Sequence, residues 1–412
     1  MITILAIFLL LLSLVSTIIL KNFSLSVFLL LLVSNTTNES SVIIASLGAT
    51  LLLQYFLIKK IEKNKVFWYI LIAFVAYYAA IFFFRPYKIH FSSYASYING
   101  FIIFLLTLSV NWNREKLTKF ITAYMSIFLF WGLMEYLFTD SLRISGPVHF
   151  ATLYAVILII VWTIWITEVV LNHGYVAKTI IMSILILIAV LLSGTRMGLI
   201  GIVLGLFLVG ISRILVTNYE KSIFTKIFSG IAFLVCLSIL TVAIWKLIPD
   251  DMLIKKTFGY LISMKLDNSN LGRVIAWLAA TETIPKHPLW GIGPYNFNIY
   301  LHNVALAYNI QNPTYHTLGH AHNLFLIVLS ELGISGFFVI GSIVFLCEFK
   351  LIHNILKGTR NSIEYAIFNG FVVMMVLGMF DGTPLTVGTL GFGGWLMGIS
   401  FHFSFLQKDK VC

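Results

Sequence analysis

Residues 179–216 read TIIMSILILIAVLLSGTRMGLIGIVLGLFLVGISRILV. Two apolar runs, 179–194 and 197–216, stand on either side of a short turn that contains Arg196. A helix needs about 20 apolar residues to cross the hydrocarbon core of a membrane, and lipid offers no partners for open backbone polar groups. The stretch therefore predicts two membrane-spanning helices joined by a tight turn.

The rest of the chain repeats this pattern. Of its 412 residues, 59% are hydrophobic and 10% are charged, whereas soluble domains carry about 25% charged residues. Because 23–35 is short for a span, we expect an all-α, polytopic membrane helix bundle of 12 or 13 spans. The further apolar runs lie near 2–20, 23–35, 41–58, 66–84, 95–112, 120–138, 148–171, 227–248, 322–347, 365–381 and 385–406.

Basic residues predict the orientation of these spans. Lys and Arg gather in alternate loops and at the C-terminus, which the positive-inside rule places in the cytoplasm. The basic loops are 59–65, 113–119, 217–226 and 348–364. Because they account for much of the net charge of +11, we expect no nucleic-acid partner.

The segment 249–321 then lies outside the cytoplasm and divides the chain into 1–248, 249–321 and 322–412. A loop this long in a compact protein is usually functional. Residues 271–283 predict an amphipathic helix at the membrane surface, ended by Pro285. The Gly-, Pro- and aromatic-rich stretch 287–297 predicts an ordered turn region.

Two arginines in outward-facing positions are candidate anion ligands. Arg196, beside Gly194 and Gly198, is suited to bidentate binding of a phosphate. Its alternative role is an interface arginine whose head reaches water. Arg273 begins the amphipathic helix, where the alternative is a solvated surface charge.

His322 stands before the span that returns to the cytoplasm, close to His316 and His320. A histidine there can exchange a proton near neutral pH, although capping or packing is an alternative. Because the spacing of His320 and His322 does not put both on one helical face, we expect no metal site and no cofactor. Among other ionisable groups at span ends, Arg143 and Asp381 are weaker candidates, and Glu331 is expected to hydrogen-bond within the bundle.

Three groups of residues then occur in an order that resembles the O-antigen ligase and O-antigen polymerase superfamily. They are SGTRMG around Arg196, GRVIAW around Arg273 followed by PLWGIGPYNF at 288–297, and His322-Asn323 with Gly333 and Gly336. The resemblance covers about 190 to 336, whereas the N-terminal spans match only as apolar helices.

The resemblance implies a membrane-embedded glycosyltransferase of the GT-C type that works without metal at the periplasmic face of the bacterial inner membrane. Its donor would be an undecaprenyl-diphosphate-linked glycan. Arg196 and Arg273 would bind the diphosphate, and His322 would orient or deprotonate the acceptor hydroxyl, with inversion at the anomeric carbon. The substrate-binding candidates are Arg143, Trp277, Tyr295, His320, Asn323 and Asp381.

The acceptor decides the branch of the superfamily. A polymerase would extend a glycan, whereas a ligase would transfer it to lipid A-core; membrane lipid and a chain-length regulator protein are further expected partners. Some ligases carry Thr-Thr after the second glycine, where this chain has Phe337 and Phe338, so we favour the polymerase. A transporter or lipid flippase is the alternative from another class. It would place ionisable residues near the middle of several spans, whereas the candidates here gather at one membrane face.

Overall fold

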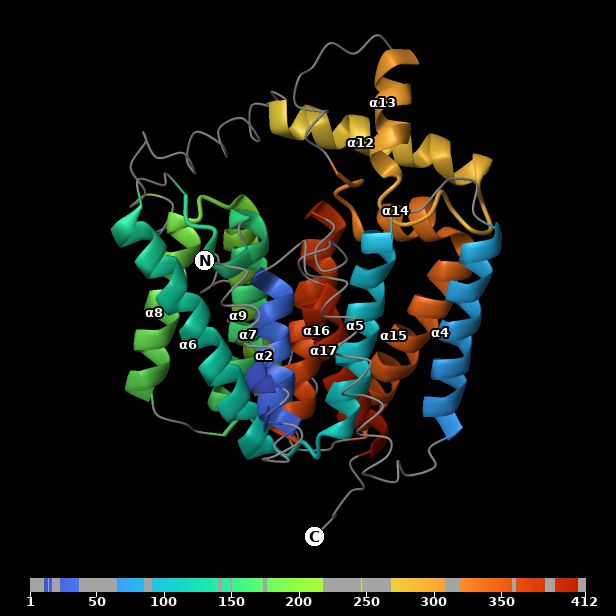
Figure 1. Cartoon of the computed structure of the whole chain (residues 1–412). Coiled ribbons are helices and arrows are strands. Elements are labelled where there is room, and N and C mark those ends of the chain that lie inside the picture. Colours follow the sequence, from blue (N-terminus) through green and yellow to red (C-terminus); the bar gives the residue numbers. More distant parts are fainter. Residues whose placement is uncertain are drawn as a thin grey trace. The chain divides into compact units, whose positions relative to one another are not determined.

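The computed structural model describes residues 11–13, 15–16, 23–36, 65–84, 91–139, 143–148, 150–172, 176–217, 246, 268–307, 319–357, 361–381 and 390–406. Within these ranges the chain forms helices and turns and no strand, which confirms the predicted all-α fold (Figure 1). The predicted spans 41–58 and 227–248, and most of 2–20, lie outside the described residues. The total of 12 or 13 spans therefore stays a prediction.

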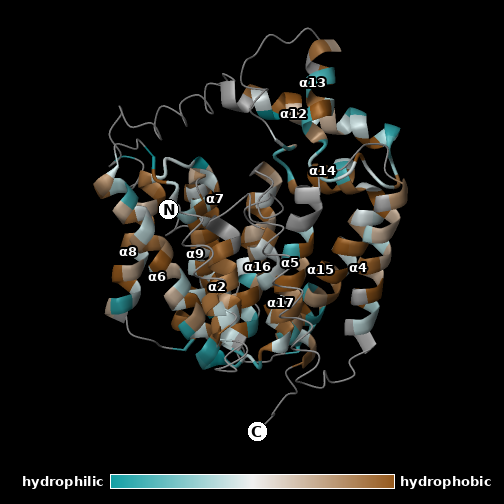
Figure 2. Cartoon of the chain, viewed as in Figure 1, coloured by the Kyte–Doolittle hydropathy of each residue, from teal (hydrophilic) through white to brown (hydrophobic). Residues whose placement is uncertain are grey.

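The described helices confirm a multi-pass membrane protein. Five helices are long and apolar enough to cross a membrane: α6 (Arg114–Phe138), α7 (Ala151–Leu171), α9 (Arg196–Thr217), the helical stretch Leu324–Leu356 and α16 (Ser362–Asp381). Shorter or less fully described apolar helices are α2 (Phe23–Thr36), α4 (Lys65–Phe84), α5 (Phe91–Ser109), α8 (Val176–Leu192) and α17 (Leu390–Phe401). Figure 2 shows apolar residues along α7 and α9 and a mixture of polar and apolar residues along α12 (Asn268–Lys286).

The helices form two compact units. Unit 1 comprises Met1–Asn111, Leu266–Glu348 and Gly378–Phe405, and unit 2 comprises Trp112–Lys265, Phe349–Leu377 and Leu406–Cys412. The predicted division of the chain at 248 and 321 rests on loop lengths and stays a prediction.

In unit 1, the parallel helices α5 and α17 pack closely through small residues. A Cβ on Gly394 would overlap the backbone carbonyl of Gly100, and one on Gly398 would lie 2.6 Å from the Thr107 side chain. Glycines four residues apart let helices approach where no hydrophobic force drives them together. At one end of α4 and α5 lie α12, α13 (Phe297–Ala307) and the short α14 (Leu324–Ile327) (Figure 1).

In unit 2, α7 is the central helix. It is apolar on all sides and buried along most of its length, because α6, α8 and α9 pack against it. A polar link inside this unit is Asn369 of α16, whose Nδ2 donates to Thr167 Oγ1 at 3.1 Å and to Ser212 Oγ at 2.9 Å.

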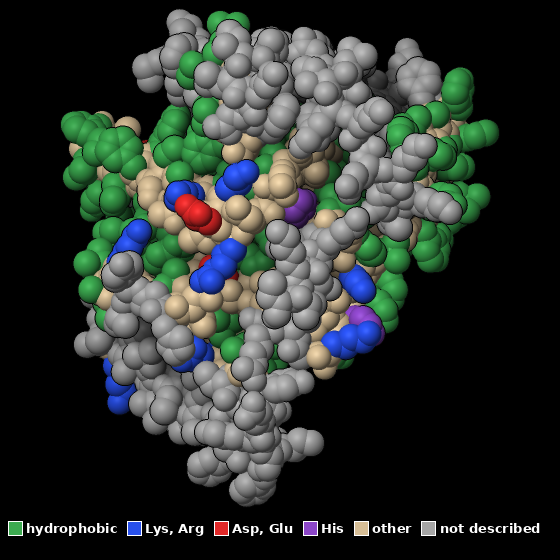
Figure 3. Space-filling view, turned by 90° about the horizontal axis from the view of Figure 1, so that it is seen from below, with side chains coloured by type: hydrophobic (Ala, Val, Ile, Leu, Met, Phe, Trp, Pro, Cys, Tyr) green, Lys and Arg blue, Asp and Glu red, His purple; other side chains and the backbone are tan. Residues whose placement is uncertain are grey.

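The helices α6 to α9 alternate in direction, so their connections fall at two opposite ends of unit 2. Residues 143–148 and 193–195 share one end, and the basic segments at 113–119 and 176–178 share the other. Figure 3 shows Lys and Arg side chains on the face at the second end. Within this unit, Arg196 therefore lies at the end opposite to the basic loop, as the sequence predicts.

Several predicted helix limits are wrong. The helix expected over 271–283 and ended by Pro285 runs from Asn268 to Lys286, so Arg273 lies inside it and does not begin it. The helix keeps its next backbone bond, from His287 N to Thr283 O at 3.2 Å. The span expected to begin at His322 begins at Leu324 instead. It is also interrupted, because a π-helical turn, η3 (Val328–Leu332), separates α14 from α15 (Gly333–Leu356).

Candidate functional site

The Gly- and Pro-rich segment 288–295 of unit 1 docks along the interrupted helix. Ile292 N donates to Ser330 O at 2.9 Å, and Ile334 N donates to Pro288 O at 2.8 Å. The π-helical turn and the restart of the helix free backbone groups that the segment satisfies, as buried backbone groups require. We call residues 288–295 and 330–335 together the backbone clamp.

Two glycines make this clamp possible. Gly291 and Gly333 have φ of 63° and 71°, a left-handed region that side chains other than glycine adopt at a cost. A Cβ on Gly291 would overlap the backbone of Glu331, and one on Gly333 would overlap the carbonyl of Leu289. Gly333 is the first of the two glycines that follow His322 and Asn323 in the motif. A glycine is required at this distance in sequence from His322 because Gly333 packs directly against the backbone of Leu289.

The second glycine of the motif, Gly336, fits against a tyrosine of α4. A Cβ there would overlap the hydroxyl of Tyr77, which donates a hydrogen bond to Leu332 O at 2.8 Å. Both motif glycines therefore allow close packing around the interrupted helix.

Glu331 holds Tyr295 in a strained conformation. The carboxylate is 2% exposed, and its Oε2 accepts the backbone N–H of Tyr295 at 3.0 Å. Tyr295 has a φ of 62°, which is rare for a residue with a large side chain. Burial raises the pKa of the Tyr295 phenol well above 10, and the nearby Glu331 carboxylate raises it further. The phenol therefore stays protonated at neutral pH and can donate a hydrogen bond.

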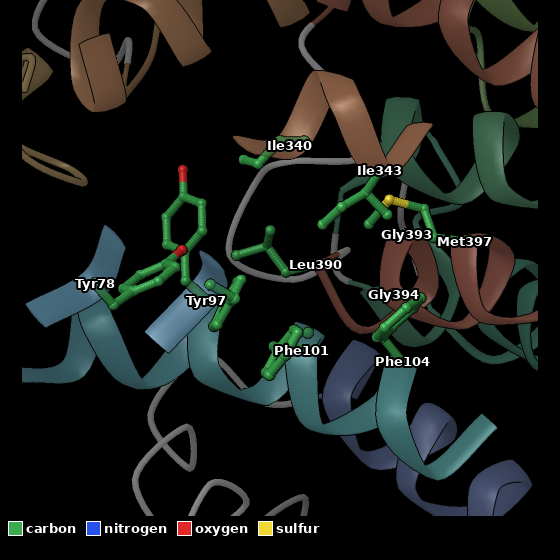
Figure 4. A pocket seen from close by; sticks show the side chains of 12 residues that line it. Tyr78, Tyr97, Phe101, Phe104, Ile340, Ile343, Leu390, Gly393, Gly394 and Met397 are labelled. Atoms are coloured by element: carbon green, nitrogen blue, oxygen red, sulfur yellow. The ribbon is translucent and has the colours of Figure 1, made fainter. Parts of the chain in front are cut away.

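Near Tyr295 lies an apolar cavity of about 60 Å³. The ring of Tyr295 is 5.9 Å from that of Tyr97, one of the lining residues. Figure 4 shows side chains of α5 on one side of the cavity and Ile340 and Ile343 of α15 on the other. Among the described residues, neither the Tyr97 nor the Tyr295 hydroxyl has a hydrogen-bond partner.

The two histidines of the motif contact each other. His322 N donates to His320 Nδ1 at 3.1 Å, and the ring centroids are 4.2 Å apart. Burial lowers the pKa of His320 to about 3, and the neighbouring His322 contributes further. His320 is therefore neutral at physiological pH, with one ring nitrogen already accepting a hydrogen bond.

His322 itself lies in a left-handed turn before the helix, with a φ of 47°. The next residue, Asn323, caps α14: its Oδ1 accepts from Phe325 N at 3.0 Å and from Leu326 N at 3.1 Å. The Asn323 Nδ2 donates to Met379 O at 2.7 Å. The predicted substrate ligand Asn323 is thus also a helix cap, and it fixes where the helix after His322 begins.

Arg273 and Trp277 lie on α12, which contacts α14 and η3. A face of small apolar residues that includes Ala276 and Ala279 packs in one cluster with Ala321 and Ile327. Arg273 is half-buried three residues before Ala276. Within unit 1, the structure thus packs the helix of Arg273 against the segment that carries His322. The Trp277 Nε1 is buried and has no hydrogen-bond partner among the described residues.

Arg196 is the first residue of α9 in unit 2 and is half-buried. The turn before it needs Gly194, which has a φ of 62°. A Cβ on Gly198 would lie 2.5 Å from the Val190 side chain. These glycines therefore serve the tight α8–α9 connection, in addition to any role in ligand approach.

Arg143, also in unit 2, contacts the turn that precedes Arg196. Its Nε donates to Ser193 O at 2.8 Å, and Nη2 lies 3.4 Å from both Gly194 O and Thr195 Oγ1. The sequence predicts Arg143 as a substrate ligand and gives no sign of this contact with the turn between α8 and α9. The sequence analysis also missed Glu135, which accepts hydrogen bonds from the loop of Arg143. A carboxylate at the end of a predicted span was the signal that could have identified it.

Two candidates fall outside this description. The side chain of Asp381, the last residue of α16, lies outside the described residues, and so does His316.

Comparison with known proteins agrees with the resemblance found in the sequence. Residues 181–341 match a protein family described as O-antigen ligase, which confirms the predicted similarity to the O-antigen ligase and polymerase superfamily. The matched range contains Arg196, Arg273 and His322. The sequence matches none of the curated proteins with which it was compared.

Proposed function

We propose that this protein is a glycosyltransferase that polymerises surface polysaccharide from lipid-linked repeat units. The observation that carries the proposal is the family match over 181–341, because this one range contains both arginines and the histidine. The reaction takes place at the periplasmic face of the inner membrane. It moves a glycan from an undecaprenyl diphosphate to a sugar hydroxyl.

The arginines bind the donor diphosphate. A guanidinium pairs with two phosphate oxygens in a fixed geometry and keeps its charge at any physiological pH. As the glycosidic bond breaks, negative charge grows on the leaving diphosphate, and a preorganised cation stabilises that charge. The half-buried position of Arg196 and of Arg273 supports this role, because partial removal from water strengthens the interaction.

His322 orients and deprotonates the acceptor hydroxyl. The role falls to His322 and not to His320, because His320, with a pKa of about 3, is a weak base whose Nδ1 already accepts a hydrogen bond. Attack by the activated hydroxyl on the anomeric carbon, opposite the leaving diphosphate, inverts the configuration at that carbon. His320 then serves to hold His322 in its left-handed turn.

The second candidate function is transfer of a finished glycan to lipid A-core. It is favoured by the description of the matching family as a ligase. The polymerase is preferred because Phe337 and Phe338 follow Gly336, where some ligases carry Thr-Thr.

The glycan pattern of cells that lack this gene separates the two functions. Loss of long chains, with a single repeat unit still attached to lipid A-core, supports the polymerase. Accumulation of full-length glycan on the carrier lipid supports the ligase instead. Normal glycan in such cells would contradict both.

Arg196→Ala, Arg273→Ala and His322→Ala should each fail to restore long chains while the protein remains folded. Arg213→Gln is the matched control, because Arg213 lies on the same helix as Arg196 at its other end and donates to Val170 O. It should restore the normal pattern. A normal pattern with any one of the three alanine variants removes that residue from the mechanism.

A further inference from the structure

We infer that Glu135 and Arg143 are positioning residues that act in series, Glu135 on the loop of Arg143 and Arg143 on the turn from which Arg196 projects. The inference rests on the proposed function of Arg196 as a ligand of the donor diphosphate. It differs from the expectation that Arg143 binds the substrate directly, and it assigns a role to Glu135.

Glu135 holds the loop that carries Arg143. Its Oε2 accepts the backbone N–H of Ser145 at 2.9 Å and that of Gly146 at 2.6 Å, while its Oε1 accepts the Ser145 hydroxyl at 2.7 Å. Three donors to one carboxylate form a strong, charge-assisted arrangement. Because Glu135 lies on the last turns of α6, it ties the loop to a membrane-spanning helix.

The same loop leaves little room for another conformation. Gly146 has a φ of 58°, and a Cβ there would overlap the ring of Tyr154. Ile144, the residue after Arg143, is fully buried, and its N–H donates to Leu192 O at 3.3 Å. The backbone from which the Arg143 side chain extends is therefore well fixed.

Arg143 in turn holds the end of α8. The last carbonyls of a helix lack partners within the helix and carry partial negative charge, so a cation there is favourable. Arg143 Nε donates to Ser193 O at 2.8 Å, and Nη2 lies 3.4 Å from Gly194 O. Two of the three guanidinium nitrogens are thus directed at the protein backbone.

Arg196 follows this turn after a single residue, Thr195, whose side chain also lies within reach of Arg143. A shift of the turn therefore moves the Cα of Arg196, and the guanidinium moves with it. Small misplacements of a substrate-binding group reduce its contribution steeply. In this arrangement Glu135 affects donor binding through Arg143, and Arg143 affects it through the turn.

The test compares donor KM, kcat and inhibition by inorganic pyrophosphate in purified full-length variants. Glu135→Ala and Arg143→Ala should each raise donor KM and the inhibitory pyrophosphate concentration by about tenfold, as expected for loss of a hydrogen bond to a charged group, with a smaller change in kcat. The double variant should match the single ones. Glu135→Gln, which keeps oxygen acceptors, should recover most of the loss, whereas Arg143→Lys should recover little, because it cannot form the fork.

Glu115→Ala is the matched control. Glu115 lies at the other end of α6 and pairs with Lys119 at 2.6 Å, so its removal should leave KM unchanged. Effects that multiply in the double variant would show that Glu135 and Arg143 act separately and would overturn the inference. So would a complete loss of activity in Arg143→Ala with no effect of Glu135→Ala.

Hydrogen exchange of residues 193–198, measured by mass spectrometry, tests the inference without activity. Glu135→Ala and Arg143→Ala should speed exchange in this segment to the same degree, and Glu115→Ala should not. Unchanged exchange in both overturns the positioning role. Unchanged pyrophosphate inhibition in Arg196→Ala would instead contradict the proposed function, whatever the exchange shows.

Discussion

Two turns, one directly before Arg196 and one that contains His322, each precede a helix and are stabilised in different ways. In unit 2, Arg143 donates to the turn before Arg196, and Glu135 holds the loop that carries Arg143. In unit 1, the turn of His322 stands before a helix that is held by the backbone clamp and requires Gly291 and Gly333. Glycines with positive φ occur at both places, Gly194 in unit 2 and Gly291 and Gly333 in unit 1. The two regions differ in that a charged side chain holds the turn in unit 2, whereas backbone hydrogen bonds between two segments hold the helix in unit 1.

The largest loss of stability is expected from substitution of a glycine in the backbone clamp. Gly333→Ala should prevent stable folding, with a loss of about 3 kcal/mol or more, because it combines a disfavoured φ with overlap of the Leu289 carbonyl. Thermal unfolding and the yield of monodisperse protein measure this. Gly341→Ala is the matched control on the same helix, since a Cβ there meets nothing within 4 Å. It should be neutral or slightly stabilising, and equal behaviour of the two variants would contradict the clamp.

A smaller effect is expected from a side chain that supports the clamp. Glu331→Leu should destabilise the protein by about 1–3 kcal/mol, because the partly buried Tyr295 N–H loses its acceptor. Glu331→Gln keeps an acceptor oxygen and should retain most of the stability. Thermal unfolding of the two variants side by side is the measurement. If the leucine variant is as stable as the glutamine variant, the bond to Tyr295 does not stabilise the fold.

The cap after His322 should contribute less. Asn323→Ala should reduce stability by about 1 kcal/mol, the usual value for an N-cap, and Asn323→Ser should recover part of it by capping α14 again. Thermal unfolding of both variants tests this, and a serine variant no more stable than the alanine variant would argue against capping.

Another effect concerns pH, and it develops only as the solution is acidified. The pKa of His320 is lowered to about 3 in the folded protein, against about 6.5 in an unfolded chain. Below about 6.5 the unfolded chain therefore binds more protons, and stability falls as the pH drops toward 3. His320→Gln should flatten this fall in a thermal unfolding series from pH 7 to pH 4. An unchanged slope would show that His320 is not held neutral by burial.

The sequence predicted the fold better than it predicted the contacts at the site. The runs 179–194 and 197–216 correspond to α8 and α9 within a few residues, and Arg196 lies at their junction. Such features follow from local composition, because lipid requires long apolar helices.

The remaining features depend on contacts between distant parts of the chain. Arg143 reaches Ser193, fifty residues away, and the Tyr295 N–H reaches Glu331, thirty-six residues away. The periodicity of apolar residues within one segment does not indicate which distant residues will form such pairs. The interruption of the helix at η3 was also missed, because the segment that satisfies its backbone groups, 288–295, lies far away in the sequence.

The central claim is that arginine binds the donor while histidine activates the acceptor. Donor KM and kcat of Arg196→Lys and His322→Gln, measured on the same preparation of lipid-linked substrate, test it most directly. Arg196→Lys should raise the donor KM, because lysine cannot bind phosphate bidentately. His322→Gln should keep a donor KM near that of the parent and lower kcat by about a hundredfold or more. A normal kcat for His322→Gln would contradict the claim.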